Sequence, residues 1–445
     1  METAAAMLLV LLAGYCTVRT RFVQFRRFPG AVRAFFTRPK SISGGVTPFQ
    51  ACATSLGATV GTGNIAGTAG AVLLGGPGAI FWMWVSALLG MGSKYLEIYF
   101  SVRCSCPRGD SAGPAGPMRY IERGLGARFR PLAVSYALFC LAAAFTTGNL
   151  VQLITLGEGY AALLAQTDFG AYGGPPVSFA CGAVCAALLA PVLFGGAQRT
   201  GRVAAALVPL MSALYVLFSL ALILSRAAEL PSAFGRIFDC ALHPRAALCG
   251  AAGAGASAPF RVGIARGMFS HEAGIGTAAL AHGSVERADA HRQALYGVFE
   301  VFLDTLVLCT LTALSLLVSG IPLPCGDSSD GVALIVQTFS PLLGGRFSGT
   351  FVAATLALFA FTSVLSFSLY GCHCTRYLFG ERAVPFYRIL FLGVCTCACF
   401  VPAAAAWKAA EWSNALAAIV NSAALFLLCE RSRAASLRRT KPRVP

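Results

Sequence analysis

A glycine-rich stretch interrupts a long apolar run near the start of the chain. The run extends from residue 47 to 74, and Gly57-Ala-Thr-Val-Gly-Thr-Gly-Asn64 lies inside it. Each of its three glycines lowers helix propensity by about 1 kcal/mol relative to alanine, so a helix is expected to break here. Non-helical backbone at membrane depth is tolerated only where it is buried in protein or lines a wet cavity. Two interpretations stay open from this stretch alone: close helix packing through small-xxx-small spacing, or a site where freed amides and carbonyls bind a ligand.

The composition indicates a helical membrane protein. The 445 residues are 57% hydrophobic and 12% charged, whereas soluble domains carry roughly 25% charged residues. We therefore expect one all-α integral membrane domain over residues 1–445. The formal charge of +16 does not indicate nucleic-acid binding, because the basic residues concentrate in particular loops.

Apolar runs predict eleven transmembrane helices, of which the first is short and the others are near or above the ~20 residues that span a bilayer. They cover residues 4–18, 47–74, 78–102, 131–165, 176–195, 203–225, 259–282, 293–319, 348–378, 385–402 and 411–429. By the positive-inside rule, the basic loop after the first helix and the basic tail 430–445 are cytoplasmic, which places the N-terminus outside. Loops 166–175 and 320–330 contain no Lys or Arg and are expected outside. Loop 226–258 is also expected outside despite its arginines, because long loops follow the rule less strictly.

A second apolar run is interrupted in the same way. Arg266, His271, Glu272 and several glycines lie inside the expected helix 259–282. Ionisable groups at that depth are costly and usually face a cavity or a partner. The two broken helices, 2 and 7, start on opposite sides of the membrane, and each opens a run of five. This predicts a 5+5 inverted repeat of helices 2–6 (residues 47–225) and helices 7–11 (residues 259–429), with an extra N-terminal helix and a basic loop in residues 1–46. Paired broken helices are the best sequence pointer to the binding site of a transporter.

The residue pattern gives less support to other classes of protein. Most of the seventeen cysteines lie in apolar runs without zinc-site spacing, so we interpret them as small apolar filler. A disulfide among Cys240, Cys249 and Cys325 stays open. No cluster of nucleophile, base and metal ligands indicates an enzyme, and no continuous polar stripe indicates a channel.

Longer motifs recur along most of the chain. They are Arg19-x-Arg21-Phe22-x-Gln24-Phe25, Thr47-Pro-Phe-Gln50, Ala58-Thr-Val-Gly-Thr-Gly-Asn-Ile-Ala-Gly67, Gly75-Gly-Pro-Gly-Ala-Ile-Phe-Trp-Met-Trp84, Gly116-Pro-Met-x-Tyr120, Gly148-Asn149-x-Val-Gln152, Arg266-Gly267-x-Phe269-Ser270, Glu272-Ala-Gly-x-Gly276, Glu300-Val-Phe-x-Asp304-Thr305 and Tyr377-Leu-Phe-Gly380. The chain resembles the alanine or glycine:cation symporters, bacterial sodium:alanine/glycine carriers with the leucine-transporter type of fold.

The resemblance implies sodium-coupled symport of a small neutral amino acid, alanine or glycine, by alternating access. It also implies the bacterial cytoplasmic (inner) membrane, contact with lipid and the sodium ion as coupling ion. A functional monomer is expected, while the oligomeric state stays open. A proton-coupled amino-acid carrier and a divergent member with another substrate stay open. The chain departs from the family where His271 replaces an asparagine and where Phe367 replaces a tryptophan expected near the substrate.

A zwitterionic substrate needs donors for its carboxylate and acceptors for its ammonium. Backbone amides after the first break suit the carboxylate, because unpaired N–H groups converge at a helix N-terminus. Carbonyls before the second break suit the ammonium. Gln152 is a candidate by resemblance, with a helix–helix hydrogen bond as an equal alternative. The expected substrate-binding residues are Thr59, Thr62, Gly63, Asn64, Gln152, Met268, Phe269, Ser270 and Phe367.

The resemblance also implies a sodium site between the first break and a pair of hydroxyls on helix 9. The expected ligands are the carbonyls of Gly57 and Val60 and the hydroxyls of Thr362 and Ser363. Adjacent hydroxyls in a membrane helix often bond only to their own backbone, so the position in the repeat decides this assignment.

Two further pairs of ionisable residues lie inside expected helices. Glu300 and Asp304 share one helix face, and a structural ion pair, with Arg266 as a candidate partner, is favoured over a coupling-ion or proton site. Lys94 and Glu97 are expected to form a gate or a structural pair.

Overall fold

The computed structural model describes residues 2–37, 45–105, 115–164, 175–242, 258–285, 289–323 and 331–440, and these ranges contain the contacts given below. They are almost entirely helical, and the isolated parallel bridge between Val46 and Val285 is the one strand-like pairing within them. The all-α prediction is confirmed. Cys249 and Cys325 lie outside the described residues, so the question of a disulfide there stays open.

The first half of the fold begins with an interrupted helix and continues with four more. Its elements are α4 (Pro48–Thr59), the π-helical turn η1 (Gly63–Gly67), α5 (Thr68–Gly75), α6 (Gly78–Ser105), α7 (Pro117–Tyr120), η2 (Ile121–Leu125), η3 (Ala127–Phe129), α8 (Arg130–Phe145), η4 (Thr146–Leu150), α9 (Val151–Leu164), α10 (Pro175–Phe194) and α11 (Gly196–Ser225). The helix expected at 131–165 is therefore continuous through a π-helical turn.

The second half repeats this order. Its elements are α13 (Ala258–His271), α14 (Thr277–His282), α15 (Ala290–Val301), η8 (Phe302–Cys309), α16 (Thr310–Val318), α17 (Gly331–Leu343), α18 (Gly345–Phe379), η10 (Glu381–Ala383), α19 (Val384–Cys397), η11 (Ala398–Phe400) and α20 (Ala403–Thr440). Before the first half come α1 (Glu2–Arg19), α2 (Val23–Arg26) and α3 (Phe28–Phe36), and between the halves come η6 (Ala227–Glu229) and α12 (Leu230–Leu242).

Seven helical runs among the described residues are long and apolar enough to cross a membrane. They are Ala127–Leu164, Pro176–Phe194, Gly196–Ser225, Ala290–Val318, Gly345–Phe379, Glu381–Phe400 and Ala403–Ser432. The interrupted helices are cut into pieces of 12 and 8 residues in α4 and α5, and of 14 and 6 residues in α13 and α14. With α1 and α6 the elements follow the expected order of spans, while the number of eleven stays a prediction.

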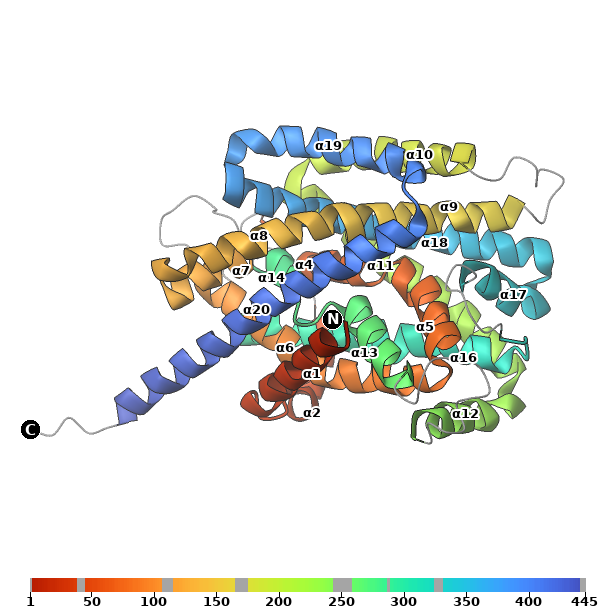
Figure 1. Cartoon of the computed structure of the whole chain (residues 1–445), viewed down its shortest axis with the longest axis horizontal. Helices are drawn as coiled ribbons and strands as arrows, with labels where there is room; N and C mark the ends of the chain where they lie inside the picture. Colours follow the sequence, from red (N-terminus) through yellow and green to blue (C-terminus); the bar gives the residue numbers. More distant parts are fainter. Residues whose placement is uncertain are drawn as a thin grey trace, which may run out of the picture.

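Counterpart helices of the two halves pack against each other. α6 contacts α15, α9 contacts α18, and α10 contacts α19. Figure 1 shows α10 beside α19 along one edge and the long α8–α9 run beside α18 below them. The broken helices lie between α18 on one side and the α6–α15 pair on the other, since α4 contacts α18 and α15 and α13 contacts α6.

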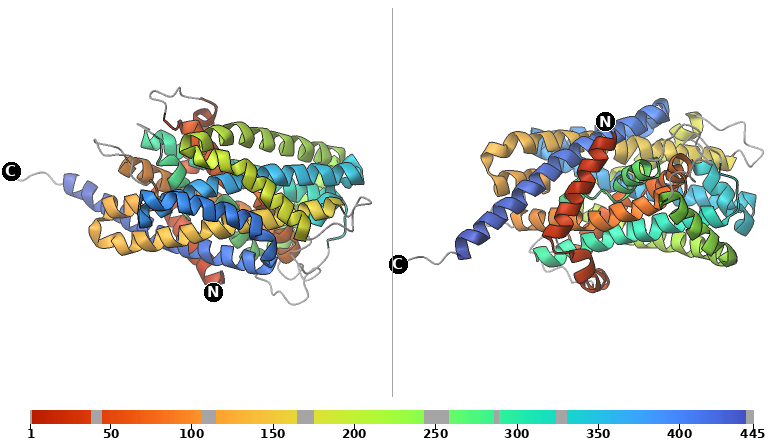
Figure 2. Two further views of the ribbon diagram at one scale, coloured as in Figure 1. Left: turned by 90° about the horizontal axis from the view of Figure 1, so that it is seen from above. Right: turned by 60° about the horizontal axis from the view of Figure 1, so that its bottom comes forward.

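Two short amphipathic helices, α3 and α12, were not predicted from the sequence. Each has an apolar and a polar face, so its average hydropathy does not distinguish it from a loop. α12 lies within the stretch expected as loop 226–258. α20 begins eight residues before the expected start at 411 and runs to Thr440. Its C-terminal end projects beyond the bundle in Figure 2.

Candidate functional site

α4, which leads into the first break, is capped at its start, at the end remote from the break. Thr47 accepts a hydrogen bond from the Gln50 amide while the Gln50 side chain accepts one from the Thr47 amide, and Pro48 fills the first helical position. α4 ends at Thr59, and Val60 has non-helical dihedrals of −77° and 79°. The amide of Gly61 then donates to Asn64 Oδ1 at 3.0 Å.

The second break lies between His271 and Thr277. Glu272 has a φ of 52°, and Gly274 and Gly276 have φ values of 94° and 92°, a region where glycine carries no steric cost. The hydroxyl of Thr277 donates to Glu272 Oε2 at 2.6 Å. The turn that interrupts the helix is therefore stabilised by a hydrogen bond between two of its own residues.

Side chains from both breaks meet at Asp304. Asn64 Nδ2 donates to Asp304 Oδ1 at 2.7 Å, and the hydroxyls of Ser270 and Thr305 donate to Asp304 Oδ2 at 2.7 and 2.8 Å. All four side chains are buried. The three hydrogen-bond donors to this buried carboxylate are neutral, so a bound cation or a proton would be favourable here.

Gln152 bridges to the first break. Its Oε1 accepts hydrogen bonds from the backbone amide of Thr62 at 3.1 Å and from the Thr62 hydroxyl at 3.0 Å. Its Nε2 donates to the carbonyl of Thr147 at 3.2 Å. In this arrangement the Gln152 amide oxygen takes the two donors of Thr62, one of the residues expected to bind a substrate carboxylate.

The expected sodium ligands are brought partly together. The Ser363 hydroxyl donates to the carbonyl of Gly57 at 2.9 Å and lies 3.3 Å from that of Ala58. Thr362, by contrast, donates to the carbonyls of Leu358 and Phe359 on its own helix at 3.1 Å. Val60 is fully buried at the break. The hydroxyl of Ser363 therefore joins α18 directly to the last turn of α4, just before the first break.

A family model described as the sodium:alanine symporter family matches residues 1–438. The chain belongs to this family. An uncharacterized transporter of Haemophilus influenzae is 37% identical over 426 residues, covering 94% of this chain and 90% of that protein. The sodium/alanine symporter AgcS of Methanococcus maripaludis is 36% identical over 431 residues, covering 95% of this chain and 91% of that protein.

A solved structure shares the fold of this sodium:alanine symporter family member. MhsT in complex with L-phenylalanine has a TM-score of 0.63 at 14% identity, covering 87% of this chain and 88% of that chain. At that identity the likeness concerns the fold alone. Together with the family it confirms a multi-pass membrane transporter, not an enzyme, from a family of sodium-coupled carriers of small amino acids.

The remaining expected substrate residues lie around the second break, on α18 and at the end of α4. The carbonyl of Met268 accepts from the amide of Glu272 at 3.0 Å, and Phe269 packs on Trp407 with ring centroids 5.4 Å apart. A cavity of about 130 Å³ opens beside Met268 and Phe269, between α13, α20 and α1.

Phe367 is fully buried against Gly148, where a Cβ added to Gly148 would overlap the Cβ and Cγ of Phe367. Thr59 is buried at the end of α4, where its hydroxyl contacts only carbonyls of the same helix among the described residues.

The structure corrects the partner of the expected ion pair. Glu300 pairs with His282 at 2.7 Å, whereas Arg266 lies 3.8 Å from Glu411 and 4.9 Å above the ring of Trp407. No local spacing in the sequence joins Glu300 to His282, because the turn after α14 brings them together.

Lys94 and Glu97 both contact the second break or its partner, and the choice between a gate and a structural pair stays a prediction. Lys94 Nζ donates to the carbonyl of His271 at 3.0 Å, and Glu97 Oε1 accepts from Asn421 Nδ2 at 2.9 Å. Asn421 also donates to the carbonyl of Gly274 at 2.9 Å. Asn421 was missed from the sequence, where an asparagine inside an apolar helix was the available signal.

Proposed function

We propose that the chain carries alanine or glycine together with sodium across the bacterial cytoplasmic membrane by alternating access, with its N-terminus outside and its C-terminus inside. The observation that supports this most is the meeting of the two breaks. Asn64 of the first and Ser270 of the second both bind Asp304 within a buried cluster. A site shared by two interrupted helices serves a ligand that must be released to either side, because movement of either half alters it.

The substrate carboxylate binds at the start of the second half of the first broken helix. One carboxylate oxygen takes the place of Gln152 Oε1 on the amide and hydroxyl of Thr62. The amides of Gly63 and Asn64 follow in the same turn. The ammonium binds the carbonyls before the second break, around Phe269 and Ser270.

Sodium binds where the Ser363 hydroxyl meets the carbonyl of Gly57. Val60 contributes its carbonyl and Thr362 its hydroxyl after rotation away from its own helix. One elementary charge moved inward is worth about 2.3 kcal/mol per 100 mV, which corresponds to roughly fifty-fold accumulation of substrate.

A proton-coupled carrier is the second candidate. Glu97, Glu272, Glu300 and Asp304 are each at most 2% exposed, and Lys94 is the fully buried lysine near them. Isolated buried charges are costly, so this excess of carboxylates favours bound cations, bound protons or both.

The test is uptake of labelled alanine into proteoliposomes that contain the purified protein. We expect uptake with a sodium gradient and its loss when choline replaces sodium. Competition by unlabelled glycine, alanine, serine and valine defines the substrate. Uptake that persists in choline and follows a proton gradient selects the second candidate.

A further inference from the structure

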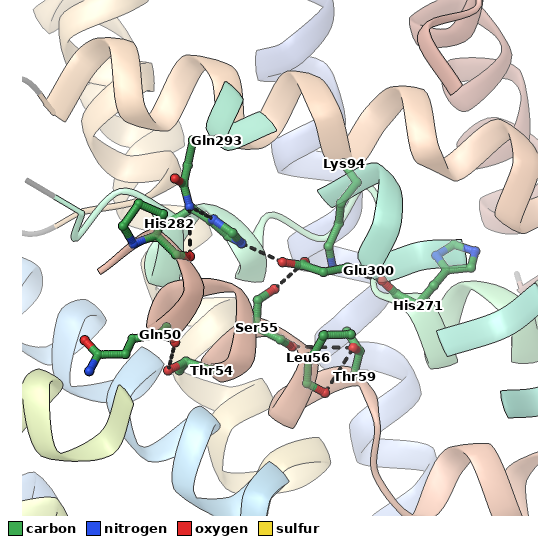
Figure 3. Close-up of polar contacts among 11 residues, drawn as sticks. Gln50, Thr54, Ser55, Leu56, Thr59, Lys94, His271, His282, Gln293 and Glu300 are labelled. Atoms are coloured by element: carbon green, nitrogen blue, oxygen red, sulfur yellow. Dashed lines mark hydrogen bonds and ion pairs between the residues drawn. The ribbon is translucent and has the colours of Figure 1, made fainter. Parts of the chain in front are cut away.

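A buried chain of hydrogen bonds joins α4 to α14 and α15 (Figure 3). The Ser55 hydroxyl donates to Glu300 Oε2 at 2.8 Å, and His282 Nε2 lies 2.7 Å from Glu300 Oε1. Gln293 Nε2 lies 2.6 Å from His282 Nδ1 and 3.3 Å from the carbonyl of Pro48. The four side chains are each at most 2% exposed, so these groups have no water to replace a lost partner.

The chain determines where the protons of His282 are. The carbonyl of Pro48 is only an acceptor, so the Gln293 side chain must present its NH₂ group to it. The same NH₂ group faces His282 Nδ1, which is therefore an acceptor without a proton. Nε2 then carries the proton and donates it to Glu300. His282 is a neutral imidazole in this arrangement.

A proton added to His282 is incompatible with the attachment of Pro48. Protonated Nδ1 becomes a donor, and Gln293 must turn its amide so that Oε1 accepts. That oxygen then faces the carbonyl of Pro48, and two acceptors cannot bond. One proton is taken up, and the hydrogen bond from Gln293 to Pro48 is lost.

Pro48 lies at the end of α4 that is remote from the break. The other end of α4 meets the non-helical residues Val60 and Gly61, where the backbone can turn. The bridge from Val46 to Val285 holds the same remote end to the segment after α14. α4 is therefore a rigid 12-residue rod with a hinge at one end and a set of attachments at the other.

We propose that His282 and Glu300 form a proton-binding pair that controls the attachment of α4 to α14 and α15. Without the extra proton Gln293 holds α4 at Pro48, and with it this attachment of the remote end of α4 is lost. The part of this proposal that concerns transport, namely opening of one side of the site, rests on the proposed function. The linkage between the proton and α4 does not.

Two further groups face the Glu300 carboxylate of the pair. Lys94 is a fully buried cation near it, and the Ser55 hydroxyl donates a hydrogen bond to it. Among the described residues, the other titratable groups beside the pair are Cys52 on α4, Glu272 at the second break, Tyr296 on α15 and Tyr370 on α18.

The test measures exposure of α4 directly, without a transported substrate. Thr54 is buried on α4, and its hydroxyl bonds to the carbonyl of Gln50 on the same helix. In the full-length protein with Cys52→Ala and Thr54→Cys, alkylation of the new thiol is followed by peptide mass spectrometry from pH 8 to pH 5.5. Each rate is divided by the rate in the same protein with His282→Gln, because that ratio cancels the intrinsic pH dependence of thiol chemistry. Gln at 282 can donate to Glu300 and cannot take up the proton.

We expect the ratio to be near one at pH 8 and to rise at least about fivefold by pH 5.5. Gln293→Met removes the attachment itself, so its labelling relative to His282→Gln should be high at every pH. His291→Gln is the matched control. His291 is an exposed histidine on α15, the helix that carries Gln293 and Glu300, and its replacement should leave the pH response intact. A ratio that stays within about twofold over the whole range overturns the proposal, provided that size-exclusion profiles show all variants folded. If the labelling ratio rises in a protein that takes up no alanine, the proton-linked attachment is supported and the proposed function is contradicted.

Discussion

The side-chain nitrogen of Asn64 lies 3.3 Å from the hydroxyl of Ser270, although 206 positions separate the two residues in the chain. Each residue belongs to one of the two interrupted helices, and both bind the carboxylate of Asp304. The breaks are therefore not independent features. Any movement of one half relative to the other must stretch or exchange the hydrogen bonds of this cluster.

Asp304→Asn tests this cluster. The variant keeps the shape but removes the charge and places an NH₂ group among donors, so at least one donor loses its acceptor. Hydrogen bonds to charged groups are worth about 1.5–3 kcal/mol, so we expect sodium-dependent uptake to fall by roughly ten- to hundred-fold. Asp239→Asn is the control, because Asp239 is exposed on α12. Uptake within twofold of the parent would show that Asp304 has no part in the site.

Ser363 and Thr362 are expected to differ in their effect on sodium. Ser363 already reaches the carbonyl of Gly57, whereas Thr362 is engaged by its own helix. We expect Ser363→Ala to raise the sodium concentration for half-maximal uptake at least about tenfold, Thr362→Ala to raise it less, and the double variant to raise it most. The substrate KM at saturating sodium should change far less, because the lost oxygen contacts the ion.

Ser368→Ala provides the matched control for the sodium prediction. Its hydroxyl is buried on the same helix but donates only to the carbonyl of Leu365 among the described residues. The sodium dependence should be that of the parent. If the Ser363→Ala and Ser368→Ala profiles coincide, the sodium site lies elsewhere.

Orientation in the membrane is predicted from the charge of the loops. A membrane-impermeant thiol reagent added outside intact cells should label Asp168→Cys and Asp327→Cys but not Arg123→Cys, in a background without reactive native cysteines. The first two lie in loops without Lys or Arg, and the third lies in a basic loop. Labelling of Arg123→Cys from outside would invert the topology.

The breaks and their order were predictable because glycines and charges inside apolar runs are local signals. Gly57, Gly61 and Gly63 mark the first break, and its structure follows at Val60 and Gly61. What the sequence does not contain is the partner of each buried polar group. His282 meets Glu300 only through the turn after α14, and Asn421 reaches Gly274 across 147 positions. Such contacts depend on how whole helices pack, and the hydropathy of a helix does not indicate which helix lies next to it. Short amphipathic helices such as α12 were not predicted for a related reason, since the hydropathies of their apolar and polar faces average out.

The choice among small amino-acid substrates is expected to depend on Phe367. Its ring is fully buried where Gly148 leaves space for it, and it packs against Tyr370 with centroids 5.4 Å apart. A phenylalanine in place of a larger ring enlarges an apolar pocket, and a methylene-sized difference changes discrimination by only about 1–3 kcal/mol. We therefore expect alanine to bind and serine, threonine and valine to be tolerated. Phe367→Trp should restore the preference for glycine and alanine, because the larger ring refills the volume.

The measurement is competition by glycine, alanine, serine and valine against labelled alanine in both proteins. Phe361→Trp, at a partly buried position of the same helix, controls for the added bulk. An identical rank order in the parent and in Phe367→Trp would remove Phe367 from the pocket and leave selectivity to the residues at the two breaks and Gln152.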